Sequence, residues 1–382
     1  MRPRYRGQMA RQRENDACPG ALQTHSAADG QLARIRLPGG LIDAAQLEAV
    51  ALAAREFGAP GLELTSRGNI QIRAVSDAAA VADRLRAAGL LPSPRHERVR
   101  NIVASPLSGR LGGVADVRAV TAGLDAAVLR DDRIVDLPGR FLFSIDDGRG
   151  DVSGLGADAG VHLVDERRAA LLLAGRDTGV RIDTDDAVDT LLAVAHRFLD
   201  VRGKCWRVAE LADPQVLLDG LAPSSGAGAT WPVTTRPPVG WLAQTDGRTT
   251  LGAAVPLGVL DAEVARYLAA VAAPMAVTPW RSVLLFDLDE DTADVALRVL
   301  APLGLVFDEN SPWLAVSACT GSPGCAQSVA DVRADAAAAL AVSPAVQTHR
   351  HFVGCDRACG SPAEGQVLIA TGDGYRPRDD HP

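Results

Sequence analysis

Two pairs of cysteines near the C-terminus constrain this chain more than any other feature. Cys319 and Cys325 are separated by five residues, and about thirty residues later Cys355 and Cys359 are separated by three. Glycine and proline surround both pairs, so the backbone can wrap closely around a compact group. Four thiolates complete the ligand set of a zinc ion or of an iron–sulfur cluster. Zinc knuckles usually space their pairs about two to four residues apart, which argues mildly against zinc. Four buried thiols or two disulfides are the alternatives, and the glycine-rich loops favour a metal or cluster site.

The composition indicates an ordinary globular protein. The chain has 382 residues, 47% hydrophobic and 23% charged, which suffices for about two or three domains. Its 39 basic and 47 acidic residues give a net charge of −8, which offers no signal for nucleic acid. No apolar run reaches the ~18 residues of a membrane span. Residues 1–16 lack the apolar segment of a signal peptide, and six cysteines do not resemble a secreted disulfide framework. We therefore expect a cytoplasmic protein with a flexible tail at 1–16.

Polar and apolar side chains alternate from Leu62 to Arg73. The odd positions are Glu63, Thr65, Arg67, Asn69, Gln71 and Arg73. A strand with this pattern packs one face on a core and displays a polar ladder on the other. Solvent explains most such faces. Two arginines with an Asn and a Gln between them would also suit a ligand with many carboxylates, because guanidinium binds carboxylate through paired hydrogen bonds.

The chain contains an internal repeat. The stretch Val255–Asp261 repeats the pattern of Leu37–Asp43, and helical periodicity follows both copies. Val277–Leu285 then stands where Leu64–Gln71 stood in the first copy. Two duplicated halves commonly build a site across their shared interface. The second copy lacks the polar ladder, so the halves are not functionally equal.

With its cysteine spacing, its duplication and its arginine segments, the chain resembles the nitrite/sulfite reductase superfamily over nearly its whole length from Cys18. The resemblance implies an α+β fold: a duplicated nitrite/sulfite reductase-like architecture with two ferredoxin-like half-domains and two α/β domains related by pseudo-twofold symmetry. The expected units are a half-domain at 17–90, an α/β domain at 91–220, a linker at 221–238, a second half-domain at 239–310 and a cluster domain at 311–382.

The resemblance also implies roles for individual residues. A T-x-R-x-x-x-Q-like strand that faces the tetrapyrrole in that superfamily matches Thr65 to Gln71, and a D-x-x-R-N segment matches Glu97 to Asn101. An L-P-R-K-F-K segment matches Leu137 to Leu142, with Arg140 at the first lysine and Leu142 at the second. The implied substrate-binding residues are Arg67, Asn69, Gln71, Arg73, Arg100, Asn101 and Arg140, and Arg67, Arg100 and Arg140 are the implied catalytic residues. Cys319, Cys325, Cys355 and Cys359 match the ligands of a [4Fe–4S] cluster, with Cys359 at the position that bridges to sirohaem iron in the reductases.

Two departures point away from the reductases. The second catalytic lysine is replaced by Leu142, and the reductase signature C-x-N-G-C is altered within Cys355–Cys359. Four segments instead resemble a branch of the superfamily that oxygenates an acidic tetrapyrrole in aerobic cobalamin biosynthesis: Ala17–Gly20, Leu37–Gly40, Thr278–Arg281 and His351–Cys355. That resemblance implies a monooxygenase that places oxygen from O2 at C20 of precorrin-3A and closes a γ-lactone. A [4Fe–4S] cluster would relay electrons that come ultimately from NAD(P)H, and a non-haem iron would activate O2.

Several points stay open at this stage. No G-x-G-x-x-G element follows a strand, so we expect no Rossmann-type nicotinamide domain and infer a separate electron-donor reductase. We also expect a monomer with no nucleic-acid or membrane partner. His25, His96, His349 and His351 have structural or surface explanations, so no ligand set for a mononuclear iron can be assigned. Cys18 could be a fifth metal ligand, a reactive thiol or, most commonly for a lone cysteine, a core residue.

Two other functions use the same features. A sirohaem-dependent assimilatory sulfite or nitrite reductase would share the scaffold. A non-enzymatic protein, either a cluster-bearing electron carrier or a zinc-stapled binding protein, would use the four cysteines alone.

Overall fold

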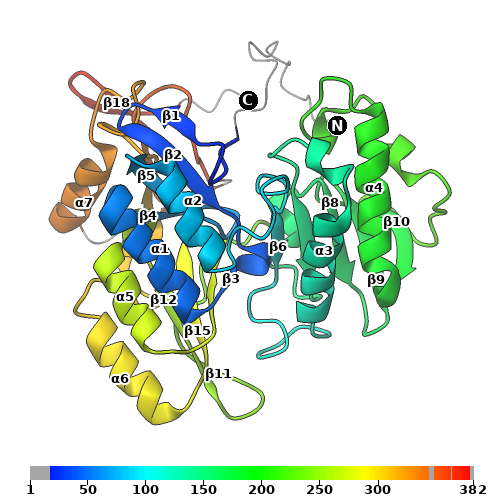
Figure 1. Ribbon diagram of the computed structural model, residues 1–382, viewed down its shortest axis with the longest axis horizontal. Helices are drawn as coiled ribbons and strands as arrows, with labels where there is room; N and C mark the ends of the chain where they lie inside the picture. Colours follow the sequence, from blue (N-terminus) through cyan, green and yellow to red (C-terminus); the bar gives the residue numbers. More distant parts are fainter. Residues whose placement is uncertain (1–17, 344–347, 363, 379–382) are drawn as a thin grey trace.

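The computed structural model describes residues 18–343, 348–362 and 364–378 (Figure 1). The expected tail at 1–16 lies outside these residues. Two five-stranded sheets dominate one part of the molecule, with strand orders β1-β2-β5-β4-β13 and β11-β12-β15-β14-β3, and every pairing within them is antiparallel. The first consists of β1 His25–Ala27, β2 Gly30–Ile35, β5 Ile70–Val75, β4 Gly61–Leu64 and β13 Val259–Asp261. The second consists of β11 Gly240–Ala243, β12 Thr249–Ala254, β15 Ser282–Leu288, β14 Met275–Val277 and β3 Leu41–Ile42.

Each of these sheets takes its last strand from the other half of the chain. In the first sheet Leu260 of β13 pairs with Leu62, and in the second Ile42 of β3 pairs with Met275. Both exchanged strands follow a short 3-10 turn, Pro38–Gly40 or Pro256–Gly258, and both lead into a helix. This symmetric exchange confirms the predicted duplicated fold. The domain limits expected from the sequence stay predictions, because each half-domain sheet contains a strand from the other half.

Four helices cover one face of the two sheets: α1 Ala44–Phe57, α2 Ala78–Ala87, α5 Ala262–Ala270 and α6 Glu290–Leu300 (Figure 1). Asp43 and Asp261 begin the two equivalent helices, α1 and α5, by accepting hydrogen bonds from the backbone N–H groups of Gln46 and Glu263, at 2.8 and 2.7 Å. Buried residues of both halves, such as Ile72 and Leu285, belong to one continuous apolar core. The two halves therefore fold around a shared interior.

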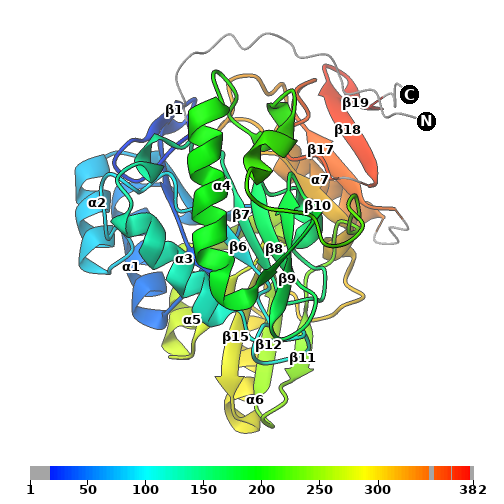
Figure 2. The ribbon, with the colours of Figure 1, turned by 90° about the vertical axis from the view of Figure 1, so that its right-hand side faces the viewer.

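A second unit contains a mixed sheet of order β10-β9-β8-β7-β6 (Figure 2). Its strands are β6 Ile102–Ala104, β7 Phe143–Asp146, β8 Ala159–Leu163, β9 Arg168–Leu173 and β10 Arg176–Asp183, and its helices are α3 Arg118–Arg130 and α4 Ala187–Val201. Short 3-10 helices occur at Ile134–Asp136, Ser153–Leu155, Thr184–Asp186, Val208–Glu210 and Pro214–Leu218. The phenyl rings of Phe141, Phe143 and Phe198 pack together in a core separate from the first.

The C-terminal unit carries the cysteines. Its sheet has the order β16-β17-β18-β19, with bounds Val316–Ala318, Arg350–Val353, Gln366–Thr371 and Gly374–Pro377. The first three strands are parallel and β19 is antiparallel to β18. Helix α7, Val332–Val342, packs on β16 and β17, and a 3-10 helix at Pro312–Ala315 precedes β16.

The alternating stretch from Leu62 to Arg73 is not the single strand that its pattern predicts. It forms a hairpin, in which β4 ends at Leu64 and β5 begins at Ile70. The backbone N–H of Thr65 donates to the carbonyl of Asn69, and Gly68 turns the chain with a φ of 65°. Because Glu63 lies opposite Gln71, the polar side chains of the two strands still share a face.

In the part of the chain that the structure describes, no helix is both long enough and apolar enough to cross a lipid bilayer.

Candidate cluster and substrate site

The parallel strands β16 and β17 bring the two cysteine loops to the same edge of the C-terminal sheet. Ala318 lies opposite Phe352, so Cys319 and the segment leading to Cys355 leave the sheet side by side. The backbone N–H of Cys319 donates to the carbonyl of Phe352 at 2.9 Å, and the N–H of Gly354 donates to the Cys319 sulfur at 3.4 Å. Parallel pairing therefore aligns the first cysteine of each pair.

The second cysteine of each pair is held by its own loop. The backbone N–H of Cys325 donates to the carbonyl of Gly321 at 2.8 Å, and His351 Nε2 donates to the carbonyl of Cys359 at 3.0 Å. Burial, followed by the charges of Cys355, Cys319 and Cys325, raises the pKa of the Cys359 thiol. The four sulfur atoms are thus close enough to repel one another as thiolates. A cationic centre that binds all four would remove this repulsion, and the donor set fits an iron–sulfur cluster.

A single-ion site has a different geometry. Among the residues that the structure describes, no group of three or more His, Cys, Asp or Glu side chains is arranged to hold one metal ion. The expected non-haem iron therefore has no ligand set in these residues, and we assign no ligands to it.

Charged side chains connect the first half-domain to the cysteine loops. Arg73 forms two 2.8 Å hydrogen bonds to Asp29, and its Nη2 also donates to the carbonyl of Gly324 at 2.5 Å. Glu63 pairs with Arg333 at 2.5 Å, and Arg333 lies in α7 of the C-terminal unit. The polar face of the hairpin therefore anchors the loop that carries Cys325.

A cavity of about 540 Å³ lies beside the cysteine loops and between the two hairpin turns. Ser66 from the first turn and Arg281 from the second both line it, together with Trp280, Trp313 and His349. A smaller hollow of about 200 Å³ shares Ser66 and Arg281 and reaches Cys319, Arg333 and Cys359. The two spaces together extend from the aromatic walls to the cysteine sulfurs.

The two turns that border this cavity are built alike. Thr65 Oγ1 accepts from the N–H groups of Arg67 and Asn69, and Thr278 Oγ1 accepts from those of Trp280 and Ser282. Trp280 therefore occupies in the second half the position of Arg67 in the first. At this equivalent position the first turn has a cation and the second an aromatic ring, so the two halves differ there as the sequence predicted.

Arg67 belongs to a cluster of guanidinium groups on the side of the first turn that faces the second unit. Burial, followed by repulsion from Arg34, lowers the pKa of Arg36 to about 10, and burial, followed by repulsion from Arg207, lowers the pKa of Arg67 to about 10. Within the described residues, the Arg67 guanidinium forms no hydrogen bond or ion pair. Buried cations that repel one another are suited to an anionic ligand.

The other predicted binding residues have partners in the protein. Arg100 forms a two-point ion pair with Asp125 of α3 at 2.7 and 2.8 Å, and Asn101 Nδ2 donates to the carbonyl of Gly139 at 2.7 Å. Asn69 Oδ1 accepts from the N–H of Leu37 at 2.8 Å, and Gln71 lies between Arg34 and Glu63. Arg140 is exposed. Their predicted roles stay predictions, since none of these contacts includes a ligand.

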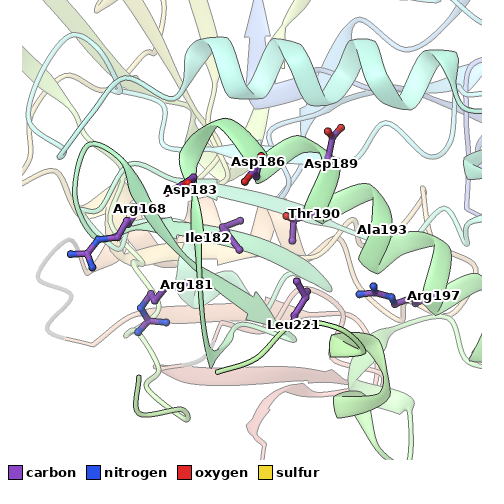
Figure 3. A pocket seen from close by; sticks show the side chains of 10 residues that line it. All are labelled: Arg168, Arg181, Ile182, Asp183, Asp186, Asp189, Thr190, Ala193, Arg197 and Leu221. Atoms are coloured by element: carbon purple, nitrogen blue, oxygen red, sulfur yellow. The ribbon is translucent and has the colours of Figure 1, made fainter. Parts of the chain in front are cut away.

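A further hollow of about 500 Å³ lies on the second unit, between the end of β10 and α4 (Figure 3). Two of its arginines are already paired with carboxylates, Arg168 with Asp165 and Arg181 with Asp177. Its lining contains none of the predicted site residues.

Comparison with known proteins agrees with this architecture. Two segments, residues 25–88 and 231–303, match the family described as the nitrite/sulfite reductase ferredoxin-like half domain. They contain the two hairpins that border the cavity. The Mycobacterium tuberculosis NirA protein has a similar fold, with a TM-score of 0.75 at 20% identity over 92% of this chain and 77% of that one. The two matched segments thus belong to this half-domain family, and the chain shares its fold with NirA.

Two curated proteins are similar to this chain in sequence. A precorrin-3B synthase of a Sinorhizobium species is 26% identical over 379 residues, which cover 94% of this chain and 81% of that protein. A ferredoxin–nitrite reductase of Synechococcus elongatus is 31% identical over 127 residues, which cover 31% of this chain and 25% of that protein. Both relatives are named as enzymes, the first as a synthase and the second as a reductase.

Sequence reasoning missed several residues of this site. It gave no role to Arg34 or Arg36, and none to Arg281 or Arg333. The alternation of Arg34, in β2, with Arg36, which directly follows β2, was the available signal for the first two, because side chains two apart in extended chain share a face. Arg281 and Arg333 carry no local signal, since only tertiary structure brings them to the cysteine loops.

Proposed function

We propose that this chain is a precorrin-3B synthase, an O2-dependent monooxygenase that hydroxylates precorrin-3A at C20 with formation of a γ-lactone, in aerobic cobalamin biosynthesis. The observation that carries the proposal is the environment of Leu142. Reduction of a small oxyanion needs cationic groups that hold it and supply protons, and the second lysine of the reductases falls on this residue. Leu142 is 4% exposed and packs with Val103, Val152 and Ala157. The Sinorhizobium relative of that name, similar over 94% of the chain, supports the same choice.

In this proposal precorrin-3A occupies the cavity between the two hairpin turns, beside the cysteine loops. Its carboxylates would bind the guanidinium group of Arg281, which lines this cavity. Arg67 and Arg140 are not among the lining residues, and they would bind carboxylates that extend past the cavity toward the second unit. Arg67 is the best-supported of the proposed catalytic residues, because its half-buried guanidinium group forms no hydrogen bond or ion pair within the described residues. Arg100 would act on the ligand only if its ion pair with Asp125 opened. Asn69, Gln71, Arg73 and Asn101 would act by fixing the turn and the loops around it.

The proposed cofactor is a [4Fe–4S] cluster held by Cys319, Cys325, Cys355 and Cys359. When bound, it would supply single electrons that come ultimately from NAD(P)H through a separate reductase. The chain's own part is to fix the four thiolates, through the hydrogen bonds at Cys319 and Cys359 and the Arg73 contact to Gly324. No step is assigned to a non-haem iron, because the described residues offer no ligand set for it. We also propose that the enzyme is a cytoplasmic monomer without nucleic-acid or membrane partners.

The second candidate is a sirohaem-dependent sulfite or nitrite reductase. The 31% identity to the Synechococcus nitrite reductase over 127 residues favours it, since that identity is higher than to the Sinorhizobium protein. Its weakness is Leu142, whose apolar contacts leave no proton donor at that position.

The deciding experiment starts with an ultraviolet–visible spectrum of anaerobically purified protein, with iron and sulfide counted on the same sample. A broad brown absorption without a Soret band, followed by hydroxylation of precorrin-3A with reductant and O2, is the expected result. A Soret band that extracts as sirohaem, with turnover of sulfite or nitrite, would replace our proposal by the reductase. If the protein holds a cluster but shows neither activity, an electron carrier is the remaining interpretation.

A further inference from the structure

Cys18 lies among guanidinium groups at the junction of the first sheet and the second unit. Its sulfur accepts hydrogen bonds from Arg34 Nη1 at 3.4 Å and from Arg36 Nη2 at 3.3 Å. The Cys18 thiol donates to the carbonyl of Gly139 at 3.1 Å. The residue is half-buried. Cysteines flanked by arginine in partly exposed positions are those that react as thiolates.

The neighbouring Arg36 has a donor without an acceptor. Arg36 is only 3% exposed, and its Nε and Nη2 donate to the carbonyls of Pro19 and Arg98 as well as to Cys18. Its Nη1 is buried and finds no hydrogen-bond acceptor in the part of the chain that the structure describes. A buried donor without an acceptor lowers the stability of the folded protein. We therefore infer that Arg36 Nη1 can donate to a group that is not part of the protein chain.

The local charge determines what that acceptor can be. Arg34, Arg36 and Arg67 are close enough to repel one another. A metal cation bound at the Cys18 sulfur would add to this repulsion, so the fifth-ligand interpretation of Cys18 is disfavoured. A negatively charged oxygen next to the sulfur would be attracted by all three guanidinium groups and would accept from Nη1.

We propose that Cys18 is a site of reversible oxidation by hydrogen peroxide, at which Arg36 holds the sulfenate product. The Cys18 thiol, which donates to Gly139, first releases its proton to solvent. The thiolate sulfur then attacks one peroxide oxygen, so that an S–O bond forms while the O–O bond breaks. Sulfur loses two electrons and the departing oxygen gains them as hydroxide, which becomes water by taking the proton of the sulfenic acid. Two molecules of a small thiol return Cys18 to its reduced form: the first forms a mixed disulfide with Cys18 and releases the oxygen as water, and the second displaces Cys18 to give the disulfide of the small thiol. The inference is independent of the proposed function, because it needs no tetrapyrrole and no cluster chemistry.

Cys205 is a matched internal control. It is also half-buried, and its thiol also donates to a backbone carbonyl, that of Glu210 at 3.4 Å. The nearby Arg202 donates to the backbone carbonyl of Cys205 instead of its sulfur. In the described residues, no guanidinium group donates to the Cys205 sulfur.

The test treats the full-length, cluster-loaded protein with limiting hydrogen peroxide in the presence of dimedone, which labels sulfenic acids. Peptide mass spectrometry then measures the label on Cys18 and Cys205. We expect Cys18 to be labelled at least about tenfold faster than Cys205, and Arg36→Gln to reduce this ratio about tenfold. Equal labelling of the two cysteines would overturn the proposal.

A second variant keeps the test decisive if Arg36→Gln does not fold. Arg34→Gln removes the other guanidinium donor to the sulfur, and its folding is checked by circular dichroism. It should also lower the labelling of Cys18, whereas Arg36→Lys should retain part of it because the charge remains. Unchanged labelling of Cys18 in folded glutamine variants would show that the arginines do not activate the sulfur, and the proposal would be wrong.

Discussion

Arg73 Nη2 donates a hydrogen bond to the carbonyl oxygen of Gly324, 2.5 Å away, although 251 residues separate them in the chain. The same guanidinium group is fixed by two hydrogen bonds to Asp29, and only 10% of its side chain is exposed. Gly324 precedes Cys325 in the first cysteine loop. The position of one proposed cluster ligand thus depends on the first half-domain.

Replacement of this arginine should therefore affect both stability and the cluster. Arg73→Gln would leave Asp29 without its partner and release the Gly324 carbonyl. Because breaking a buried ion pair leaves an uncompensated charge, we expect a loss of about 3 kcal/mol in the free energy of unfolding. Urea denaturation measures this loss, and the absorption of the cluster should fade faster in the variant.

An exposed ion pair provides the control for Arg73. Arg55 pairs with Glu263 at 2.7 Å, but both side chains are about half exposed, at 44% and 51%. Arg55→Gln should change stability by less than about 1 kcal/mol. Equal effects of the two substitutions would contradict the anchoring role of Arg73.

Arg67 should act on the ligand and not on the metal. In Arg67→Ala, binding of precorrin-3A should weaken by about 1.5–3 kcal/mol, the value of a hydrogen bond to a charged group. The absorption of the cluster should not change, because Arg67 forms no hydrogen bond or ion pair with the described residues of the cysteine loops. Equilibrium titration followed by fluorescence measures the affinity, with Arg55→Ala as a control for the loss of one positive charge.

Replacement of Cys355 should remove the cluster, in contrast to replacement of Arg67. Cys355→Ser removes one thiolate from the proposed cluster, so its visible absorption and its sulfide content should be lost. The visible spectrum and the iron and sulfide content of the same sample measure this loss. If Arg67→Ala and Cys355→Ser lost the cluster to the same extent, our division between a ligand-binding turn and a metal-binding loop would be mistaken.

Asp151 should make the protein less stable as the pH rises. Burial, opposed by a 2.6 Å hydrogen bond from Ser105 and reinforced by Asp146, raises the pKa of Asp151 to about 7. An unfolded aspartate titrates near pH ~4, so between about pH 4 and 7 the folded state keeps a proton that the unfolded state releases. Stability therefore falls as the pH rises through this window.

Asp151→Asn tests this linkage because the amide cannot ionise. Above pH 7 the variant should be more stable than the original protein, by about 1–3 kcal/mol, and the difference should vanish near pH 4. Thermal unfolding at several pH values measures it. Asp132→Asn, at a side chain that is 81% exposed, should show no such trend.

The first hairpin shows where a sequence pattern fails. Glu63 and Gln71 face each other across the turn, and they are eight positions apart, an even number. The alternation of polar and apolar residues therefore continues through the turn as if the strand had not ended. Only Gly68, at a φ of 65°, marks the change of direction, and a single glycine is a weak signal.

The cysteines and the repeat could be predicted because their information is local. Cys319 and Cys325 are only six positions apart, and each proline turn, at Pro38 or at Pro256, is recognised from the few residues beside it. The ion pair between Arg100 and Asp125 could not be predicted, since only the packing of α3 brings the two side chains together. The same holds for the Arg73 contact to the cysteine loop.

The exchange of β3 and β13 has a consequence for how the molecule can be made. Neither half could complete its own sheet in isolation, because the last strand of each is encoded in the other half. A gene cut at the linker, 221–238, should yield two fragments that are insoluble apart and assemble only when they are produced together. The two halves thus form a single cooperative folding unit, in which neither half can be removed or replaced without disrupting the sheet of the other.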